Sequence, residues 1–181
     1  MTVIDIRGTH GSGKSWCMHQ LLDQYEHQPI TEEGKHIGYT LPDLEAALVG
    51  KYATVTGGCD GVGTADEVVR RVRLFASQYR YVLLEGILVS HSFKRYHELA
   101  LEVGDYRWLF MSTPLRNCIA RVRARRRARG NLKPLSPHNV IKDHVSVWTN
   151  IQRKARDAGH RVVVVPWRDP LPTVLHELGV S

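Results

Sequence analysis

A glycine-rich stretch near the start of the chain has the residue types and the spacing of a phosphate-binding loop. Glycines let the backbone curl so that successive N–H groups point into one cavity, and a following helix presents its free N–H groups and positive dipole end to the same anion. A lysine at the end of such a loop reaches the β- and γ-phosphates of a nucleotide, and the next hydroxyl is a ligand for Mg²⁺. The pattern G-x-x-x-x-G-K-[ST] is fitted by Gly8, Thr9, His10, Gly11, Ser12, Gly13, Lys14 and Ser15.

The loop therefore predicts that the protein binds ATP with Mg²⁺, with Lys14 on the phosphates and Ser15 on the metal. His10 lies inside the loop, where its backbone is expected to contribute rather than its imidazole ring.

Two acidic residues are candidates for a catalytic or ligand-binding role beside the phosphates. Glu85 ends an apolar run, 81–85, that suits a buried strand, and Gly86 follows it. A strand that ends beside the loop would place the carboxylate of Glu85 near the γ-phosphate, where it binds Mg²⁺ or accepts the proton of an acceptor hydroxyl. Asp60, in the glycine-rich segment 57–63, is the second candidate, for acceptor binding or as the base. The structural alternatives are a helix-capping role for Glu85 and a turn-forming role for Asp60.

The positive charge of the chain is concentrated in one segment. The formal net charge is +7, and residues 116–133 alone carry seven arginines, one lysine and no acid, so the remainder sums to −1. Arg121, Arg125 and Arg129 share one face of a helix at i, i+4 and i+8. We interpret the segment of about 116–135 as a cationic lid, in which Arg121 and Arg125 face the phosphates and stabilise transition-state charge.

These groups need a scaffold that brings strand ends and helix starts together. Apolar strands alternate with helices, which favours an α/β protein with a parallel sheet covered by helices on both faces, and 1–181 is predicted to form a single domain. Thr64 is predicted to cap one helix and Thr113 to cap another, with Pro114 in its first turn. Strands are expected at 3–7, 36–40, 52–56, 81–85, 106–111 and 161–166, and helices at 15–25, 64–78, 92–101, 113–130, 136–158 and 170–178.

The composition excludes several classes of protein. Three cysteines without a C-x-x-C pair argue against a disulfide framework or a zinc site and are expected to be small buried thiols. The chain starts without a charged leader before an apolar stretch, and its apolar runs are far shorter than the roughly 20 residues of a membrane span. A cytoplasmic protein is expected, and a homodimer is left open. There is no N-K-x-D motif of a GTPase, and the length argues against a motor ATPase.

The order of these parts resembles the nucleoside and nucleoside-monophosphate kinase family. The phosphate loop, the strand ending at Glu85, and the strand 106–111 followed by Thr113-Pro114 and the arginine helix occur in that order. The resemblance implies a three-layer P-loop NTPase fold with a parallel sheet and an Arg-rich helical lid over ATP. The chain departs from the family at Gly86, where deoxynucleoside kinases carry an arginine, so the resemblance implies no arginine contact to the acceptor at this position.

A narrower resemblance is to phage P-loop kinases that phosphorylate 5-hydroxymethyluracil already incorporated in DNA. It rests on Gly50-Lys51-Tyr52, Gly57-Gly58-Cys59-Asp60 and Leu84-Glu85-Gly86 with Ser90. It implies that a base-linked hydroxymethyl group is the acceptor, that Tyr39 and Tyr52 stack on a base, and that the basic segment holds DNA. The alternatives are a kinase of free nucleosides or nucleoside monophosphates, a polynucleotide 5′-hydroxyl kinase, and an ATP-dependent nucleic-acid binding protein.

Overall fold

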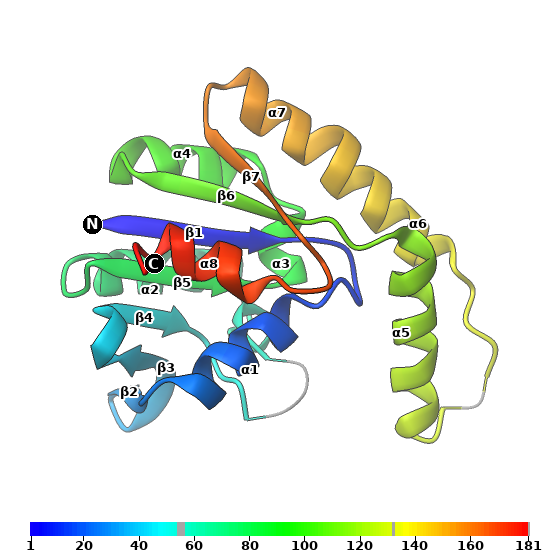
Figure 1. Ribbon diagram of the computed structural model, residues 1–181, viewed down its shortest axis with the longest axis horizontal. Coiled ribbons are helices and arrows are strands. Elements are labelled where there is room, and N and C mark those ends of the chain that lie inside the picture. The colour runs from blue at the N-terminus through cyan, green and yellow to red at the C-terminus, as the bar shows by residue number, and fades with distance from the viewer. Residues whose placement is uncertain (54–56, 132, 181) are drawn as a thin grey trace.

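The computed structural model describes residues 1–53, 57–131 and 133–180, and within them seven strands form one sheet (Figure 1). The strand order is β2-β3-β4-β5-β1-β6-β7. Five neighbouring strands, from β4 to β7 in that order, pair in parallel, whereas β2 and β3 join the edge antiparallel. The strands are β1 (Thr2–Arg7), β2 (Gln28–Glu32), β3 (Lys35–Leu41), β4 (Ala46–Val49), β5 (Tyr81–Glu85), β6 (Tyr106–Met111) and β7 (Arg161–Val165).

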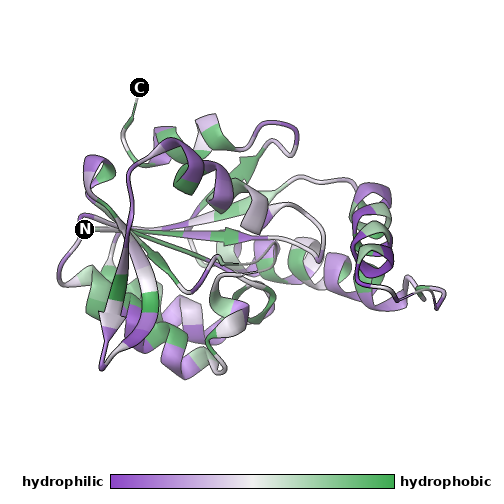
Figure 2. Ribbon diagram, turned by 90° about the horizontal axis from the view of Figure 1, so that it is seen from below, coloured by the Kyte–Doolittle hydropathy of each residue, from purple (hydrophilic) through white to green (hydrophobic). Residues whose placement is uncertain are grey.

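Helices cover both faces of this sheet, as the alternating pattern predicted. The helices are α1 (Lys14–Gln24), α2 (Ala65–Ala76), α3 (Ile87–Ser90), α4 (Lys94–Val103), α5 (Leu115–Ala128), α6 (His138–Val145), α7 (Gln152–Asp157) and α8 (Leu171–Glu177). Successive strand residues point to opposite faces, so each strand feeds two cores. One core joins Val82 and Trp108 to α2, α4 and α7, and the other joins Leu83 and Leu109 to α1 and α8. Figure 2 shows hydrophobic residues along the strands.

The predicted parallel sheet is correct for the central strands and incomplete at one edge. β1 and β5 are buried along their whole length, so their apolar runs were recognisable. β2 is largely exposed and turns into β3 through Glu33 and Gly34, both with positive φ, which gives a hairpin that its polar sequence did not predict. The predicted strand at 52–56 is wrong at Tyr52, which lies outside every strand, and residues 54–56 lie outside the described residues.

Helix starts were predicted with mixed success. Thr64 caps α2 as predicted, because its hydroxyl accepts a hydrogen bond from the N–H of Glu67. The predicted cap at Thr113 is wrong: α5 starts at Leu115, and the Thr113 hydroxyl donates instead to the carbonyl of Ser12 at 2.6 Å. The predicted helix 136–158 begins at His138 and runs through α6, a π-helical stretch, Ser146–Ile151, and α7.

α5 stands at one end of the long axis of the molecule, beyond the sheet (Figure 1). A small apolar cluster of Cys118, Val122 and Val140 holds it against α6. Its backbone also lies close to the phosphate loop, since a side chain at Gly11 would meet the carbonyl oxygen of Cys118 at 2.7 Å. The arginine helix is thus held beside the loop by tight packing.

Cys17, Cys59 and Cys118 are buried free thiols, which confirms the reading of the cysteines as core residues. Among the helices of residues 1–53, 57–131 and 133–180, none combines the length and the apolar character that crossing a membrane requires.

Candidate active site

The loop 8–13 connects the end of β1 to the start of α1, so the first free N–H groups of α1 and the loop N–H groups face one cavity. Gly11 and Gly13 have φ of 75° and 101°, a left-handed backbone that favours glycine. The N–H of Ser12 donates to the carbonyl of Thr9 at 3.1 Å, and the N–H of Gly8 donates to the hydroxyl of Ser90 at 3.2 Å. These bonds hold the loop in a curled form.

Lys14, the first residue of α1, is buried and bends back over the loop. Its Nζ donates to the carbonyl oxygen of Gly8 at 2.8 Å and to that of Thr9 at 3.4 Å. Burial lowers the pKa of Lys14, while the charges of Glu85 and Asp60 act in the opposite direction. An ammonium held among loop carbonyls in this way is positioned to exchange them for phosphate oxygens.

Glu85 and Ser15 meet across the bottom of the cavity. The hydroxyl of Ser15 donates to Oε1 of Glu85 at 3.0 Å, and the Glu85 side chain is buried. Burial raises the pKa of Glu85 to about 7, against the opposing effects of Lys14 and of the Ser15 hydrogen bond. Glu85, which the sequence analysis expected near the γ-phosphate and Mg²⁺, thus lies beside Ser15 of the loop. A carboxyl group with this pKa can exchange a proton near neutral pH.

Two glycines make room for the two acids. Gly58 has a φ of 72° and lies so close to Glu85 that any side chain at this position would collide with the carboxylate. A Cβ at Gly86 would lie 2.8 Å from Oδ1 of Asp60. That same oxygen accepts a hydrogen bond from the N–H of Leu88 at 3.0 Å. Asp60 thus occupies the space beside position 86.

The predicted arginine face of α5 is turned toward the loop. Arg121, Arg125 and Arg129 all line the cavity. Arg121 donates to the carbonyl of Ser12 at 3.3 Å, and its guanidinium lies 5.4 Å from the ring centre of Trp167. Burial and the neighbouring charge of Arg129 lower the pKa of Arg125. Cations crowded on one face without acids between them favour an anionic ligand.

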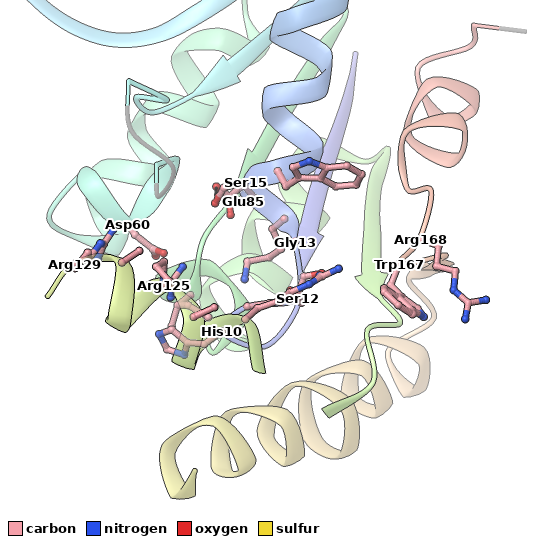
Figure 3. A pocket seen from close by; sticks show the side chains of 17 residues that line it. His10, Ser12, Gly13, Ser15, Asp60, Glu85, Arg125, Arg129, Trp167 and Arg168 are labelled. Atoms are coloured by element: carbon pink, nitrogen blue, oxygen red, sulfur yellow. Dashed lines mark hydrogen bonds between the residues drawn. The ribbon is translucent and has the colours of Figure 1, made fainter. Parts of the chain in front are cut away.

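The cavity between the loop and α5 has a volume of about 1220 Å³. Asp60, Arg125 and Arg129 lie on one side of it and Trp167 and Arg168 on the other, with Gly13, Ser15 and Glu85 between them (Figure 3). The sequence reasoning did not predict Trp16, Ile87, Trp167 and Arg168 as lining residues. The available signal for Trp167 and Arg168 was their place just after the carboxyl end of β7, the edge where parallel sheets bind ligands.

His10 lines the cavity, and its ring is paired with a residue of α6. Its Nδ1 pairs with Oδ2 of Asp143 on α6, and Asp143 also lies 3.3 Å from Nε2 of His91. The Thr9 hydroxyl is 3.2 Å from Nδ1 of His144. The His10 ring therefore fastens the loop to α6, a role that the sequence did not indicate.

The two tyrosines expected to stack on a base do not line the cavity. Tyr52 is 4% exposed and packs in the core beside α1, with its ring edge-on to His19. Tyr39 is half-buried against the rings of His27 and His36. Their stacking role is not supported by this arrangement.

The fold and the site together define a P-loop phosphotransferase of the kinase class. The chain is 35% identical over 145 residues to the 5-hmdU DNA kinase of Pseudomonas phage PaMx11, covering 76% of this chain and 77% of that protein. It is 31% identical over 191 residues to the 5-hmdU DNA kinase of Delftia phage PhiW-14, covering 93% of this chain and 72% of that protein. The chain belongs to the family of the phage 5-hmdU DNA kinases.

The chain was also compared with solved structures and with family profiles. Among solved structures, a deoxyadenosine kinase from M. mycoides is similar with a TM-score of 0.47 and 12% identity, over 99% of this chain and 100% of that chain. No known family profile matches the chain.

Proposed function

We propose that this protein transfers the γ-phosphoryl group of ATP to the hydroxymethyl group of 5-hydroxymethyluracil in DNA, in the cytoplasm of a phage-infected cell. The observation that carries the proposal is the pair of Ser15 and Glu85 beneath the phosphate loop, 3.0 Å apart, in a chain that belongs to the 5-hmdU DNA kinases. The pair supplies a metal-binding hydroxyl and a carboxyl group at the point where the γ-phosphate would lie.

ATP, the phosphoryl donor, fits the side of the cavity formed by the phosphate loop. The loop N–H groups and Lys14 would hold the β- and γ-phosphates, and the buried hydroxyl of Ser12, which has no hydrogen-bond partner among the described residues, is a further donor to them. Trp167 offers an aromatic face to the adenine base beside Arg121.

The residues present also fit Mg²⁺. Ser15 and Glu85 are hard oxygen ligands, and Mg²⁺ in kinases is held by one or two such side chains together with phosphate oxygens and waters. When bound, the ion would neutralise charge that develops on the β- and γ-phosphate oxygens.

Phosphoryl transfer needs an oriented acceptor hydroxyl and a base that takes the proton of that hydroxyl. The acceptor oxygen forms a bond to the γ-phosphorus while the bond from that phosphorus to the β–γ bridging oxygen breaks, which releases ADP. Glu85, buried beside Ser15 beneath the phosphate loop, takes the proton of the hydroxyl. Asp60, with one oxygen held by the N–H of Leu88, orients the acceptor from the other side of the cavity.

The arginines of α5 stabilise the negative charge of the phosphoryl group during its transfer. Arg121 and Arg125 line the cavity and would contact the oxygens of the transferring phosphoryl group, over which negative charge is spread in the transition state. A base that is part of a DNA duplex must leave the stack to reach Glu85, and single-stranded DNA avoids that cost.

The test is phosphate transfer from radiolabelled ATP to three acceptors: DNA that contains 5-hydroxymethyluracil, the same DNA with thymine, and the free nucleoside. We expect label only in the first. Lys14→Ala should reduce transfer by about 10² or more, since it removes a positive charge from the transferred group, whereas Lys35→Ala on the distant strand β3 should not. Label confined to the free nucleoside, or full transfer by Lys14→Ala, would refute the proposal.

A further inference from the structure

α5 carries arginines on two opposite faces. Each residue of an α-helix turns by about 100°, so Arg121, Arg125 and Arg129 cluster on one side, the side that lines the cavity. Arg116, Arg123 and Arg127, at i, i+7 and i+11, cluster within about 40° of each other on the opposite side. We call these three the outer row. None of the outer row lines the cavity.

The outer row is exposed and has no acidic partner. Across residues 1–53, 57–131 and 133–180, no ion pair or hydrogen bond joins a carboxylate to Arg116, Arg123 or Arg127. The lack of acidic partners distinguishes the outer row, because many other surface arginines of the molecule are paired with a carboxylate. Such pairs are made by Arg70, Arg73, Arg80, Arg95, Arg107, Arg153 and Arg161.

The packing of α5 fixes the outer row in space. Cys118 and Val122 attach the helix to α6, and its backbone at Cys118 touches the loop at Gly11. The cavity face and the outer row are therefore held about 180° apart around one rigid helix, at the end of the molecule farthest from the β2–β3 hairpin (Figure 1).

The spacing of the outer row suits a regular polyanion. At about 1.5 Å per residue, the row extends over about 16 Å of helix. A DNA strand carries a phosphate about every 3.4 Å along the duplex axis, so several phosphates fall within that length. Arginine is well suited to phosphate oxygens, and three like charges without acids gain most from an anionic partner.

We propose that the outer row binds the phosphate backbone of the DNA whose modified base enters the cavity. One helix then serves two anions, with the nucleotide phosphates on its inner side and the DNA backbone on its outer side. This inference rests on the proposed function, because it takes DNA as the polymer that carries the acceptor.

The test compares the wild type with two triple variants that each lose three positive charges. The outer-row variant carries Arg116→Ala, Arg123→Ala and Arg127→Ala. The control carries Arg70→Ala, Arg73→Ala and Arg80→Ala, which removes the same charge from another surface. DNA affinity is measured by fluorescence anisotropy on labelled 5-hydroxymethyluracil DNA between 50 and 200 mM salt, and transfer kinetics are measured on the same DNA.

We expect the outer-row variant to bind DNA more weakly and with a smaller salt dependence, while its KM for ATP and its kcat at saturating DNA stay unchanged. Three lost phosphate contacts should reduce the slope of log affinity against log salt by about 2 to 3. Over this salt range the wild type should thus lose about 20- to 40-fold more affinity than the variant. Lysines at the three positions should restore the slope, because the contact needs charge alone.

An unchanged affinity and slope in the outer-row variant would overturn the inference, as would an equal effect in the control variant. The proposed function is tested separately by transfer from the wild type. If the wild type phosphorylates the DNA and the outer row has no effect on binding, only this inference fails. If the wild type transfers no label to DNA, the proposed function fails.

Discussion

The hydroxyl of Ser15, at the start of α1, lies 3.0 Å from Oε1 of Glu85, at the end of β5. These residues are 70 positions apart in the chain, and they meet because β1 and β5 are parallel neighbours, with Ile6 opposite Glu85. The phosphate loop starts just after β1, so the end of β5 lies beside it. The topology of the sheet thus supplies the acid that the loop needs.

The first prediction concerns the role of Glu85 in proton transfer. Glu85→Gln keeps the size of the side chain and a group that can accept from Ser15, but it removes the basic oxygen. We expect kcat for DNA phosphorylation to fall by about 10²- to 10⁴-fold, measured with saturating ATP and DNA. A loss of less than tenfold would show that another group takes the proton.

The second prediction concerns the stability of the ligand-free protein. The pKa of Glu85 is raised from its usual 4.5 to about 7 by burial, so between these pH values the folded protein keeps a proton that the unfolded chain has released. The contribution of this group is most favourable below pH 4.5 and declines as the pH rises to about 7. The loss is of the order of 3 kcal/mol.

Urea unfolding without Mg²⁺ or ATP from pH 4.5 to 8 measures this decline. The difference in unfolding free energy between Glu85→Gln and the wild type should grow across that range in favour of the variant. Glu98→Gln, on the exposed side of α4, serves as the control and should follow the wild type. A constant difference between Glu85→Gln and the wild type at all pH values would contradict the assignment.

The third prediction concerns Gly86, which leaves room for the carboxylate of Asp60. A methyl group at this position would lie 2.8 Å from Oδ1 of Asp60 and would force that carboxylate to move. We expect Gly86→Ala to lower kcat/KM for DNA about tenfold or more, as expected for a displaced positioning group, with KM for ATP unchanged. Gly61→Ala, next to Asp60 in the chain but with open space around the added methyl group, should behave as wild type. Equal effects of both substitutions would indicate that Asp60 has no positioning role.

The parts of the site that could be predicted are those whose residue types and spacing rarely occur together for another structural or functional reason. The glycine-lysine-serine pattern marked Lys14 and Ser15, and the apolar strand that ends at Glu85 marked the acid that lies beside Ser15. The cavity face of α5 followed from helical spacing. Trp167 and Arg168 were not predicted, because a residue after a strand acquires a role only once the order of the strands is known.

Elements of the fold that depend on tertiary contacts were likewise not predicted from the sequence. β3 was predicted at 36–40, but β2 is exposed and polar, so its formation depends on pairing with β3 and its sequence carries little periodic signal. Thr113 had the sequence of a helix cap, yet tertiary contact with the carbonyl of Ser12 takes its hydroxyl. Nothing in the sequence indicated the partner of Asp5, a buried acid in β1.

That partner is Arg7, and the last prediction concerns this buried pair. Both side chains are fully buried, with Nε of Arg7 donating to Oδ2 of Asp5 at 2.7 Å. The guanidinium also lies 4.0 Å from the ring centre of Trp108 and donates to the carbonyl of Ser92 at 3.1 Å. Removing the cation leaves a buried carboxylate without its counter-charge, which costs about 3–5 kcal/mol.

We therefore expect Arg7→Met to lower the unfolding free energy by about that amount in urea titrations at pH 7. Arg73→Met, which breaks an exposed pair with Glu102, should cost at most about 1 kcal/mol. Adding Asp5→Asn to Arg7→Met should recover part of the loss, because the amide carries no charge and its oxygen still accepts from the Tyr106 hydroxyl, now 2.8 Å from Asp5. A double variant less stable than Arg7→Met would mean that the cost comes from lost packing on Trp108 and Tyr96 rather than from the uncompensated charge of Asp5.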